Sequence, residues 1–247
     1  VRYGNAVLVD ARGDRYAMQT GYADGRITLR ADRDVLDRVA FPVVVDPVLM
    51  TFTMDTSASY DLSQPDIAFG LTDRRYMVAW EFRNSASDYD VLAAAVDPSG
   101  IVIPGTAAWI DISTDSWQTP RIAYNYLGNR FLVVASVVPT GGGDASIKSR
   151  ARNSANTGAG VVQQISGGDG GSKVSPDVGG DFAMFAPTYF AVVWQPSLSA
   201  SDTDVHYRMV GGDGIPVGTA QVIDNSAATL DLRPRIANVL NAIAIVY

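Results

Sequence analysis

The chain of 247 residues carries a formal net charge of −7 and contains no cysteine. This acidic balance argues against a general nucleic-acid binder, whose affinity comes largely from Lys and Arg side chains that neutralise phosphates. The missing cysteines exclude a disulfide framework, a thiolate zinc site and a cysteine nucleophile. Glu81 is the only glutamate, so the other acidic residues are turn-forming aspartates, which together with 23 Gly and 12 Pro predict an all-β fold.

The first 50 residues read as a small β segment that does not share the pattern of the rest. Stretches at 6–10, 15–19 and 26–30, separated by turns rich in Asp and Gly, predict three strands, and 41–47 predicts a fourth. The run from Ala40 to Pro47, Ala-Phe-Pro-Val-Val-Val-Asp-Pro, resembles a β segment that precedes repeat regions in many large secreted bacterial proteins. This resemblance implies an extracellular setting.

From Pro65 onward a short pattern recurs four times at a nearly constant interval. Successive prolines lie 55, 56 and 58 residues apart, and each copy is followed by an apolar stretch, at 76–80, 131–135, 190–194 and 243–247. The copies are Pro65-Asp66-Ile67-Ala68, Pro120-Arg121-Ile122-Ala123, Pro176-Asp177-Val178-Gly179 and Pro234-Arg235-Ile236-Ala237. Self-similarity at this period, built from short strands, is typical of β-propeller blades.

Each repeat is expected to form a four-stranded sheet, with strands in the first repeat at 65–69, 76–82, 91–96 and 108–113. We therefore predict an N-terminal β segment at 1–50 and propeller repeats over 51–247, with blades starting near residues 65, 120, 176 and 234. Three blades are complete and the fourth is partial, whereas a closed ring takes four to eight. We expect sequence beyond Tyr247 or another chain to complete the ring. The alternative is that the N-terminal strands close a small four-bladed ring.

The repeated pattern P-x-[IV]-A, then [YF]-x-V-x-W, then D-x-D-[VI] is similar to that of a family of secreted bacterial β-propeller repeats. The resemblance covers residues 51–247 and implies blade architecture in a secreted or cell-surface protein. It implies no particular activity, because propellers carry adhesins, lectins, enzymes and plain scaffolds on one framework.

Two acidic loops are candidate calcium sites. Asp88 and Asp90 follow the second strand of the first repeat, and Asp202 and Asp204 hold the same place in the third. Carboxylates at this spacing, with nearby hydroxyls and carbonyls, can supply several of the six to eight oxygens that Ca²⁺ requires. The alternative is that these aspartates cap turns by accepting backbone N–H bonds.

Two aromatic residues are candidate ligand contacts. Trp117 stands in the connection before Pro120, and Tyr60 holds the corresponding place before Pro65. An exposed aromatic ring there could stack on a sugar or anchor a protein partner, or it could pack against the next blade. Trp80 and Trp194 occupy equivalent repeat positions, so we expect them to be structural.

The sequence favours a non-catalytic scaffold or adhesion module that binds protein or glycan, because the repeats are regular and no asymmetric cluster of catalytic side chains stands out. The single histidine, His206, lies on a predicted strand without a nucleophile motif. One alternative is a carbohydrate-active enzyme or lectin that uses the propeller funnel, and another is a subunit of a larger extracellular assembly. No apolar run reaches the roughly 18 to 20 residues of a membrane-spanning helix.

Overall fold

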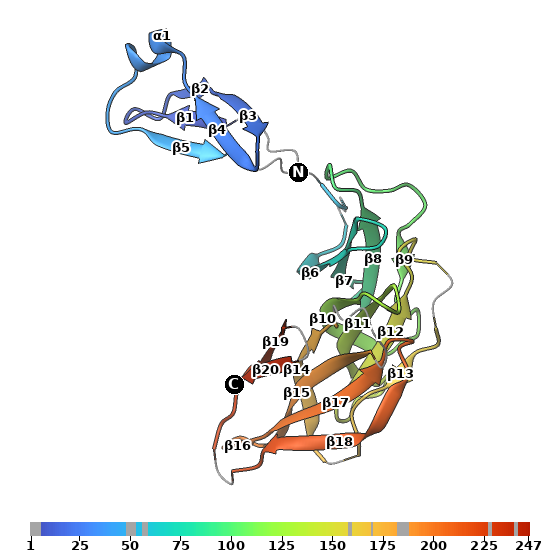
Figure 1. Ribbon diagram of the computed structural model, residues 1–247. Helices are drawn as coiled ribbons and strands as arrows, with labels where there is room; N and C mark the ends of the chain where they lie inside the picture. Colours follow the sequence, from blue (N-terminus) through green and yellow to red (C-terminus); the bar gives the residue numbers. More distant parts are fainter. Residues whose placement is uncertain are drawn as a thin grey trace. The chain divides into compact units, whose positions relative to one another are not determined.

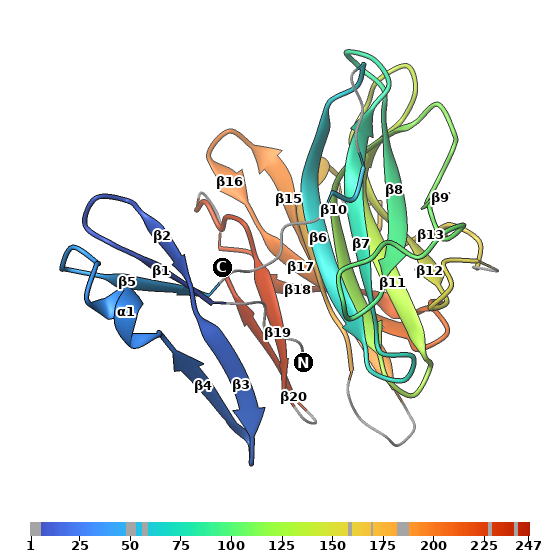
Figure 2. The ribbon, with the colours of Figure 1, turned by 90° about the horizontal axis from the view of Figure 1, so that it is seen from above.

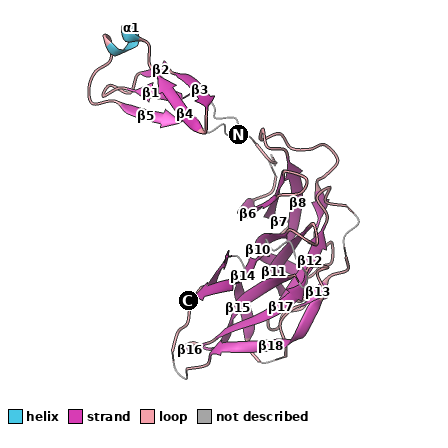
Figure 3. Cartoon of the chain, in the orientation of Figure 1, coloured by secondary structure: helices cyan, strands magenta, loops and turns pink. Residues whose placement is uncertain are grey.

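The computed structural model describes residues 6–47, 53–55, 59–157, 160–168, 170–181, 188–226, 229–239 and 242–247. The chain divides into two compact units, Val1–Thr53 and Met54–Tyr247, which we call the N-terminal unit and the stacked-sheet unit. Antiparallel strands make up nearly all of the regular structure, which confirms the all-β prediction (Figures 1 and 3). No described helix is long and apolar enough to cross a membrane.

The N-terminal unit contains a three-stranded sheet, a separate hairpin and one helical turn. Its elements are β1 (Ala6–Val9), β2 (Arg15–Ala17), β3 (Gln19–Ala23), β4 (Arg26–Arg30), α1 (Arg33–Leu36) and β5 (Val44–Pro47). β1 lies between β2 and β5, and β3 pairs with β4. Buried Ala6, Leu8 and Met18 form a small core. One strand was predicted at 15–19, but the structure has β2 ending at Ala17 and a second strand, β3, beginning at Gln19, so β3 was not predicted.

The stacked-sheet unit consists of three sheets and a last hairpin. Sheet 1 contains β6 (Leu62–Gly70), β7 (Arg75–Arg83), β8 (Tyr89–Val96) and β9 (Ala108–Trp109). Sheet 2 contains β10 (Ser116–Asn125), β11 (Arg130–Val138), β12 (Ser146–Arg152) and β13 (Gln163–Gln164). Sheet 3 contains β14 (Ser172–Gly179), β15 (Tyr189–Ser199), β16 (Asp202–Thr203), β17 (Val205–Gly211) and β18 (Pro216–Asp224). The last hairpin pairs β19 (Arg235–Val239) with β20 (Ala242–Val246).

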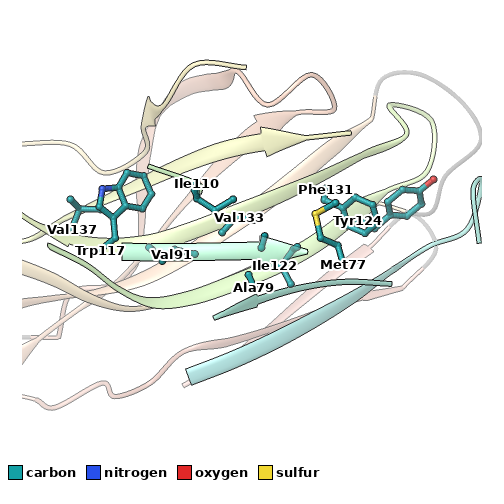
Figure 4. Close-up of a cluster of buried hydrophobic side chains, with 12 residues drawn as sticks. Met77, Ala79, Val91, Ile110, Trp117, Ile122, Tyr124, Phe131, Val133 and Val137 are labelled. Carbon is teal, nitrogen blue, oxygen red and sulfur yellow. The ribbon is translucent and has the colours of Figure 1, made fainter. Parts of the chain in front are cut away.

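Strands in each sheet follow one another in chain order, and the sheets pack face to face in series (Figure 2). Alternate residues of β11 point to opposite faces, as in any strand. Phe131 and Val133 join the cluster shared with sheet 1 (Figure 4), and Leu132 and Val134 join the cluster shared with sheet 3. Sheet 2 is therefore buried on both faces. We call the face of a sheet that points to the preceding sheet its upstream face, and the other its downstream face.

The residue before each repeat proline adopts an unusual backbone conformation. Gln64, Thr119, Ser175 and Arg233 have φ angles of 50°, 50°, 51° and 55°, in the left-handed region that few residues other than glycine enter. In sheets 1, 2 and 3 the strand register shifts at this residue, which marks a β-bulge. In these three sheets the recurring proline therefore belongs to a β-bulge in the first strand.

Polar side chains link each sheet to the next at these bulges. Glu81 Oε1 of sheet 1 accepts a bond of 2.5 Å from the Thr119 N–H of sheet 2. In sheet 3, Gln195 holds the same repeat position, and its Oε1 accepts from the Arg233 N–H at 3.1 Å. The equivalent Ser136 of sheet 2 donates to the Lys173 carbonyl at 2.7 Å. In three repeats, therefore, the side chain at this one position forms a hydrogen bond with the backbone of the following repeat unit.

A second link uses the variable residue of the Pro-x-Ile/Val pattern. Asp66 Oδ2 accepts from the Ile122 N–H at 2.8 Å, and Asp177 Oδ2 accepts from the Ile236 N–H at 2.9 Å. Each of these carboxylates therefore reaches the equivalent strand of the next repeat.

The described sheets form an open series, so a closed propeller ring stays a prediction. Among the described residues, β1 pairs with β2 and with β5, β3 pairs with β4, and β19 pairs with β20. The four-bladed alternative also stays a prediction. One strand boundary differs from the prediction. The last strand of sheet 1 ends at Trp109 rather than residue 113, although the Ile110 N–H still bonds the Val91 carbonyl at 2.8 Å.

Candidate functional site

The first acidic loop connects β7 to β8 and is closed by its own hydrogen bonds. The backbone N–H groups of Asn84 and Ser85 donate to the Asp88 carbonyl at 2.9 and 3.1 Å, and the Asn84 side-chain amide donates to Asp90 Oδ2. Burial raises the pKa of the Asp90 carboxyl above its usual range, and the negative charges of Asp88 and Asp111 act in the same direction. None of these three bonds runs from a backbone N–H to an aspartate carboxylate, so the turn-capping alternative also stays a prediction.

One observation favours a cation in this loop. The Oδ1 atoms of Asp88 and Asp90 are both buried without a hydrogen-bond donor, and such acceptors are normally satisfied in folded proteins. Against this, the described part of the chain holds no group of three or more His, Cys, Asp or Glu side chains that could bind a metal ion. Calcium at Asp88 and Asp90 therefore stays a prediction.

The second acidic loop differs from the first. Asp202 belongs to the two-residue strand β16, which pairs with β15, and its Oδ1 is buried without a donor. Asp204 is buried, and its Oδ2 lies 3.7 Å from His206 Nε2. The His206 ring packs 6.0 Å from the Trp194 ring. The structure thus brings Asp204 together with the only histidine inside sheet 3, and calcium at Asp202 and Asp204 also stays a prediction.

Trp117 lies in the core rather than on a binding surface. Its side chain is 0% exposed and belongs to the cluster between sheets 1 and 2 (Figure 4). Its ring therefore cannot stack on a ligand, which corrects the ligand-contact prediction for Trp117 in favour of the packing alternative. The reason is that β10 begins at Ser116, so Trp117 is already part of a strand that faces sheet 1.

Of the two candidate aromatic residues, Tyr60 is the accessible one. Its side chain is 46% exposed, and its ring stacks at a tilt on Phe82 with the centroids 4.7 Å apart. Phe82 in turn meets Trp109 edge to face at 5.1 Å. Tyr60 therefore stands at the end of a short aromatic row on the upstream face of sheet 1.

Polar side chains surround Tyr60 in a hollow of about 190 Å³. Its lining is Ser59, Tyr60, Asp61, Arg83, Asn84 and Ser85. Arg83 bonds Asp61 Oδ2 at 3.2 Å and the Ser85 carbonyl at 3.1 Å, and its guanidinium lies 5.6 Å from the Tyr89 ring centre. Asp61, Arg83 and Asn84 could not be predicted as neighbours of Tyr60, because the pairing of Leu62 with Phe82 is what brings the two segments together.

A second hollow, of about 390 Å³, also borders the first acidic loop. It is lined by Ser87, Asp88, Thr114, Ser116 and residues 138–142. Beside it, Asp115 accepts from Lys148 Nζ at 2.9 Å and from the Thr140 N–H at 2.9 Å. The Lys148 bond, followed by the Thr140 bond, lowers the pKa of the Asp115 carboxyl below its usual range. Asp115 is therefore engaged in holding the loops together.

No family model matches the chain, and no curated protein matches it. One similar solved structure is that of an N-acetylgalactosamine deacetylase from F. plautii in complex with blood group B trisaccharide. The two chains are 11% identical, and the superposition covers 90% of this chain and 69% of that chain with a TM-score of 0.49. At this level the likeness assigns neither an activity nor a ligand to the present protein.

Proposed function

We propose that the stacked-sheet unit is a set of β-propeller blades that serves as a non-catalytic binding scaffold in a secreted or cell-surface protein. The observation that carries this proposal is the repetition of the links between sheets. Glu81, Ser136 and Gln195 occupy one repeat position, and each bonds the following repeat unit at or next to its bulge. Repeat proteins owe their stability to such nearest-neighbour contacts, and they present binding loops from the stack.

The proposal is tested by following ligands after incubation with the protein. A mixed pool of glycans and peptides is incubated with the chain, and both the bound and the free fractions are analysed by mass spectrometry. We expect ligands to be retained and recovered with unchanged masses. Conversion of any component at a rate above that of the buffer control would overturn the non-catalytic assignment.

A glycan-binding role is the second candidate, and the hollow at Tyr60 is the observation that favours it. An accessible aromatic ring can cover the apolar C–H face of a pyranose, and the neighbouring carboxylate, amide and guanidinium groups of Asp61, Asn84 and Arg83 can hydrogen-bond its hydroxyls. The sugar would enter a site that the strand pairing of β6 with β7 has already formed.

The glycan candidate is tested on a glycan array with a matched pair of variants. Tyr60→Ala should abolish binding to the glycans that the wild-type chain retains. Tyr22→Ala removes another exposed tyrosine, in the N-terminal unit, and should leave binding unchanged. An array without any retained glycan, or equal loss in both variants, would remove this candidate and leave protein ligands for the scaffold.

A further inference from the structure

The hollow of about 390 Å³ between the β7–β8 loop of sheet 1 and the β11–β12 loop of sheet 2 holds a carboxylate that lacks a donor. Asp88 lines this hollow, and its Oδ1 is buried without a hydrogen-bond donor. A buried acceptor left unpaired costs stability, and nearly all such groups in folded proteins have a partner. A ligand that brings a donor to Asp88 would therefore supply what the described residues do not.

The equivalent carboxylate at the next junction between sheets is paired by the chain itself. Residues 56 positions later take the same repeat positions, so Asp144 corresponds to Asp88 and Ser172 to Ser116. Asp144 Oδ1 accepts a hydrogen bond from Ser172 Oγ at 3.2 Å. Ser116 Oγ instead accepts from the Gln118 side-chain amide at 3.0 Å. The same two repeat positions bond each other between sheets 2 and 3, whereas Asp88 Oδ1 is left without a donor.

The glycine loop between β11 and β12 keeps the first junction open. Gly141 and Gly142 have φ angles of 92° and 90°, and a Cβ added to either would meet no atom within 4 Å. At the second junction, a Cβ on Gly171 would instead collide with the Ser197 carbonyl. Space for a ligand therefore exists at the unpaired carboxylate, while the backbone is closely packed at the paired one.

The charge of the hollow calls for a ligand with one positive charge. Asp88 is the only charged residue among those that line it. The neighbouring Asp115 is already paired with Lys148 at 2.9 Å, so it adds no free negative charge. Because a hydrogen bond between ionised groups is roughly twice as strong as one between neutral groups, a cation is favoured over a neutral ligand at Asp88.

The other lining groups fit an ammonium group on an alkyl chain. An ammonium carries three N–H donors, and the hydroxyls of Ser87 and Thr114 can accept two of them beside the Asp88 carboxylate. Val138 and Pro139 give an apolar wall along which methylene groups can lie. Ca²⁺ fits this hollow less well, because it takes six to eight oxygens and the lining supplies one carboxylate.

We propose that this hollow binds an alkyl ammonium group, as carried by a lysine side chain of a protein ligand, with Asp88 as its counter-ion. The inference rests on the binding-scaffold function proposed above, for which it names one ligand chemistry. The contact lies at a junction between two sheets, where loops of both repeats meet the ligand.

The test follows the amide resonances of the chain by NMR while Nα-acetyl-lysine methylamide is added from about 0.1 to 20 mM, a range of weak affinities. A chelator is present throughout, because calcium would compete for Asp88. One matched probe carries an acetylated ε-amine, which removes the charge. Another, glucosamine, carries its ammonium directly on a ring. Asp88→Asn removes the counter-ion, and Asp144→Asn alters the equivalent carboxylate that the chain already pairs.

The lysine probe should saturate the wild-type chain, with the largest shifts at Gly141 and Gly142. Its affinity should fall at least about tenfold in Asp88→Asn and change less than about twofold in Asp144→Asn. The acetylated probe and glucosamine should each bind more weakly than the lysine probe. Absence of saturation, equal or tighter binding of either matched probe, or equal losses in the two variants would overturn the inference.

The scaffold function can fail or hold independently of this site. If the mixed pool described above yields retained, unchanged ligands while the lysine probe does not bind, the ammonium site is wrong and the scaffold remains. If the pool shows conversion of a component, the non-catalytic assignment is wrong whatever the lysine probe does.

Discussion

Sheets 1 and 2 carry the same repeat, yet sheet 2 is buried on both faces, whereas the upstream face of sheet 1 is buried at Val78 and Trp80 and exposed at Tyr76. Tyr76 and Phe131 are the second residues of β7 and β11 and hold equivalent positions, but Tyr76 is 37% exposed and Phe131 is fully buried. Their strands pair alike, since Tyr76 lies opposite Phe69 and Phe131 opposite Tyr124. The difference shows that the repeat sequence specifies the strand, while the neighbouring sheet decides what that strand contributes to stability.

The largest expected effect comes from truncating the two equivalent aromatics. Phe131→Ala leaves a cavity between sheets 1 and 2 and should lower the free energy of unfolding by about 3 to 5 kcal/mol. Tyr76→Ala removes a partly solvated ring and should cost less than about 1 kcal/mol. Urea denaturation of both variants provides the measurement. Equal losses would contradict the assignment of one open and one closed face.

The link at Glu81 should give the next largest effect. Glu81 is 5% exposed, accepts from Thr119 across the interface and also accepts from Ser63 Oγ at 2.6 Å. Glu81→Ala leaves buried donors unpaired and should cost about 1.5 to 3 kcal/mol. Gln195→Ala removes the equivalent neutral link and should cost about 1 kcal/mol. Thermal and urea unfolding of both variants provide the measurement. An unchanged free energy of unfolding for Glu81→Ala would contradict this account.

Much of this architecture could be predicted from the sequence, because spacing and alternation report directly on strands. The repeat predicted β7 and β11 to within one or two residues at their starts, and the apolar run at 131–135 matches a strand buried on both faces. Trp117 could not be assigned to a face, since the bulge at Thr119 breaks the alternation that would have placed it. Asp61 and Arg83 could not be joined to Tyr60 before the strand register was known.

Asp177 makes the stability of the sheet 3 interface depend on pH. Burial raises the pKa of its carboxyl in the folded chain, so the folded state holds this proton more tightly than the unfolded state does. Its contribution is fully present below the unfolded pKa of about 3.9 and is lost as pH rises through the higher folded value. Asp177→Asn should therefore gain stability relative to the wild type over that pH window. If the free energy of unfolding changed with pH in the same way for Asp177→Asn and the wild type, the raised pKa of Asp177 would be contradicted.

The smallest effect concerns calcium in the first acidic loop. If Ca²⁺ binds the oxygens of Asp88 and Asp90, saturating calcium should raise the unfolding temperature of the wild-type chain, because a ligand stabilises the state that binds it. Asp90→Asn should abolish that shift, and a chelator should reverse it. An unfolding temperature that is the same with calcium and with chelator would leave these aspartates as turn caps.

Thiol labelling tests the central comparison most directly, because the chain contains no cysteine. Tyr76→Cys, Phe131→Cys and Phe190→Cys each place one thiol at the same repeat position of a different sheet, and a water-soluble maleimide reports its exposure. We predict fast labelling of Tyr76→Cys and protection of the other two until the chain unfolds. Labelling of all three thiols at one rate, or protection of Tyr76→Cys in the folded chain, would contradict the account that this repeat position is exposed in sheet 1 and buried in sheets 2 and 3.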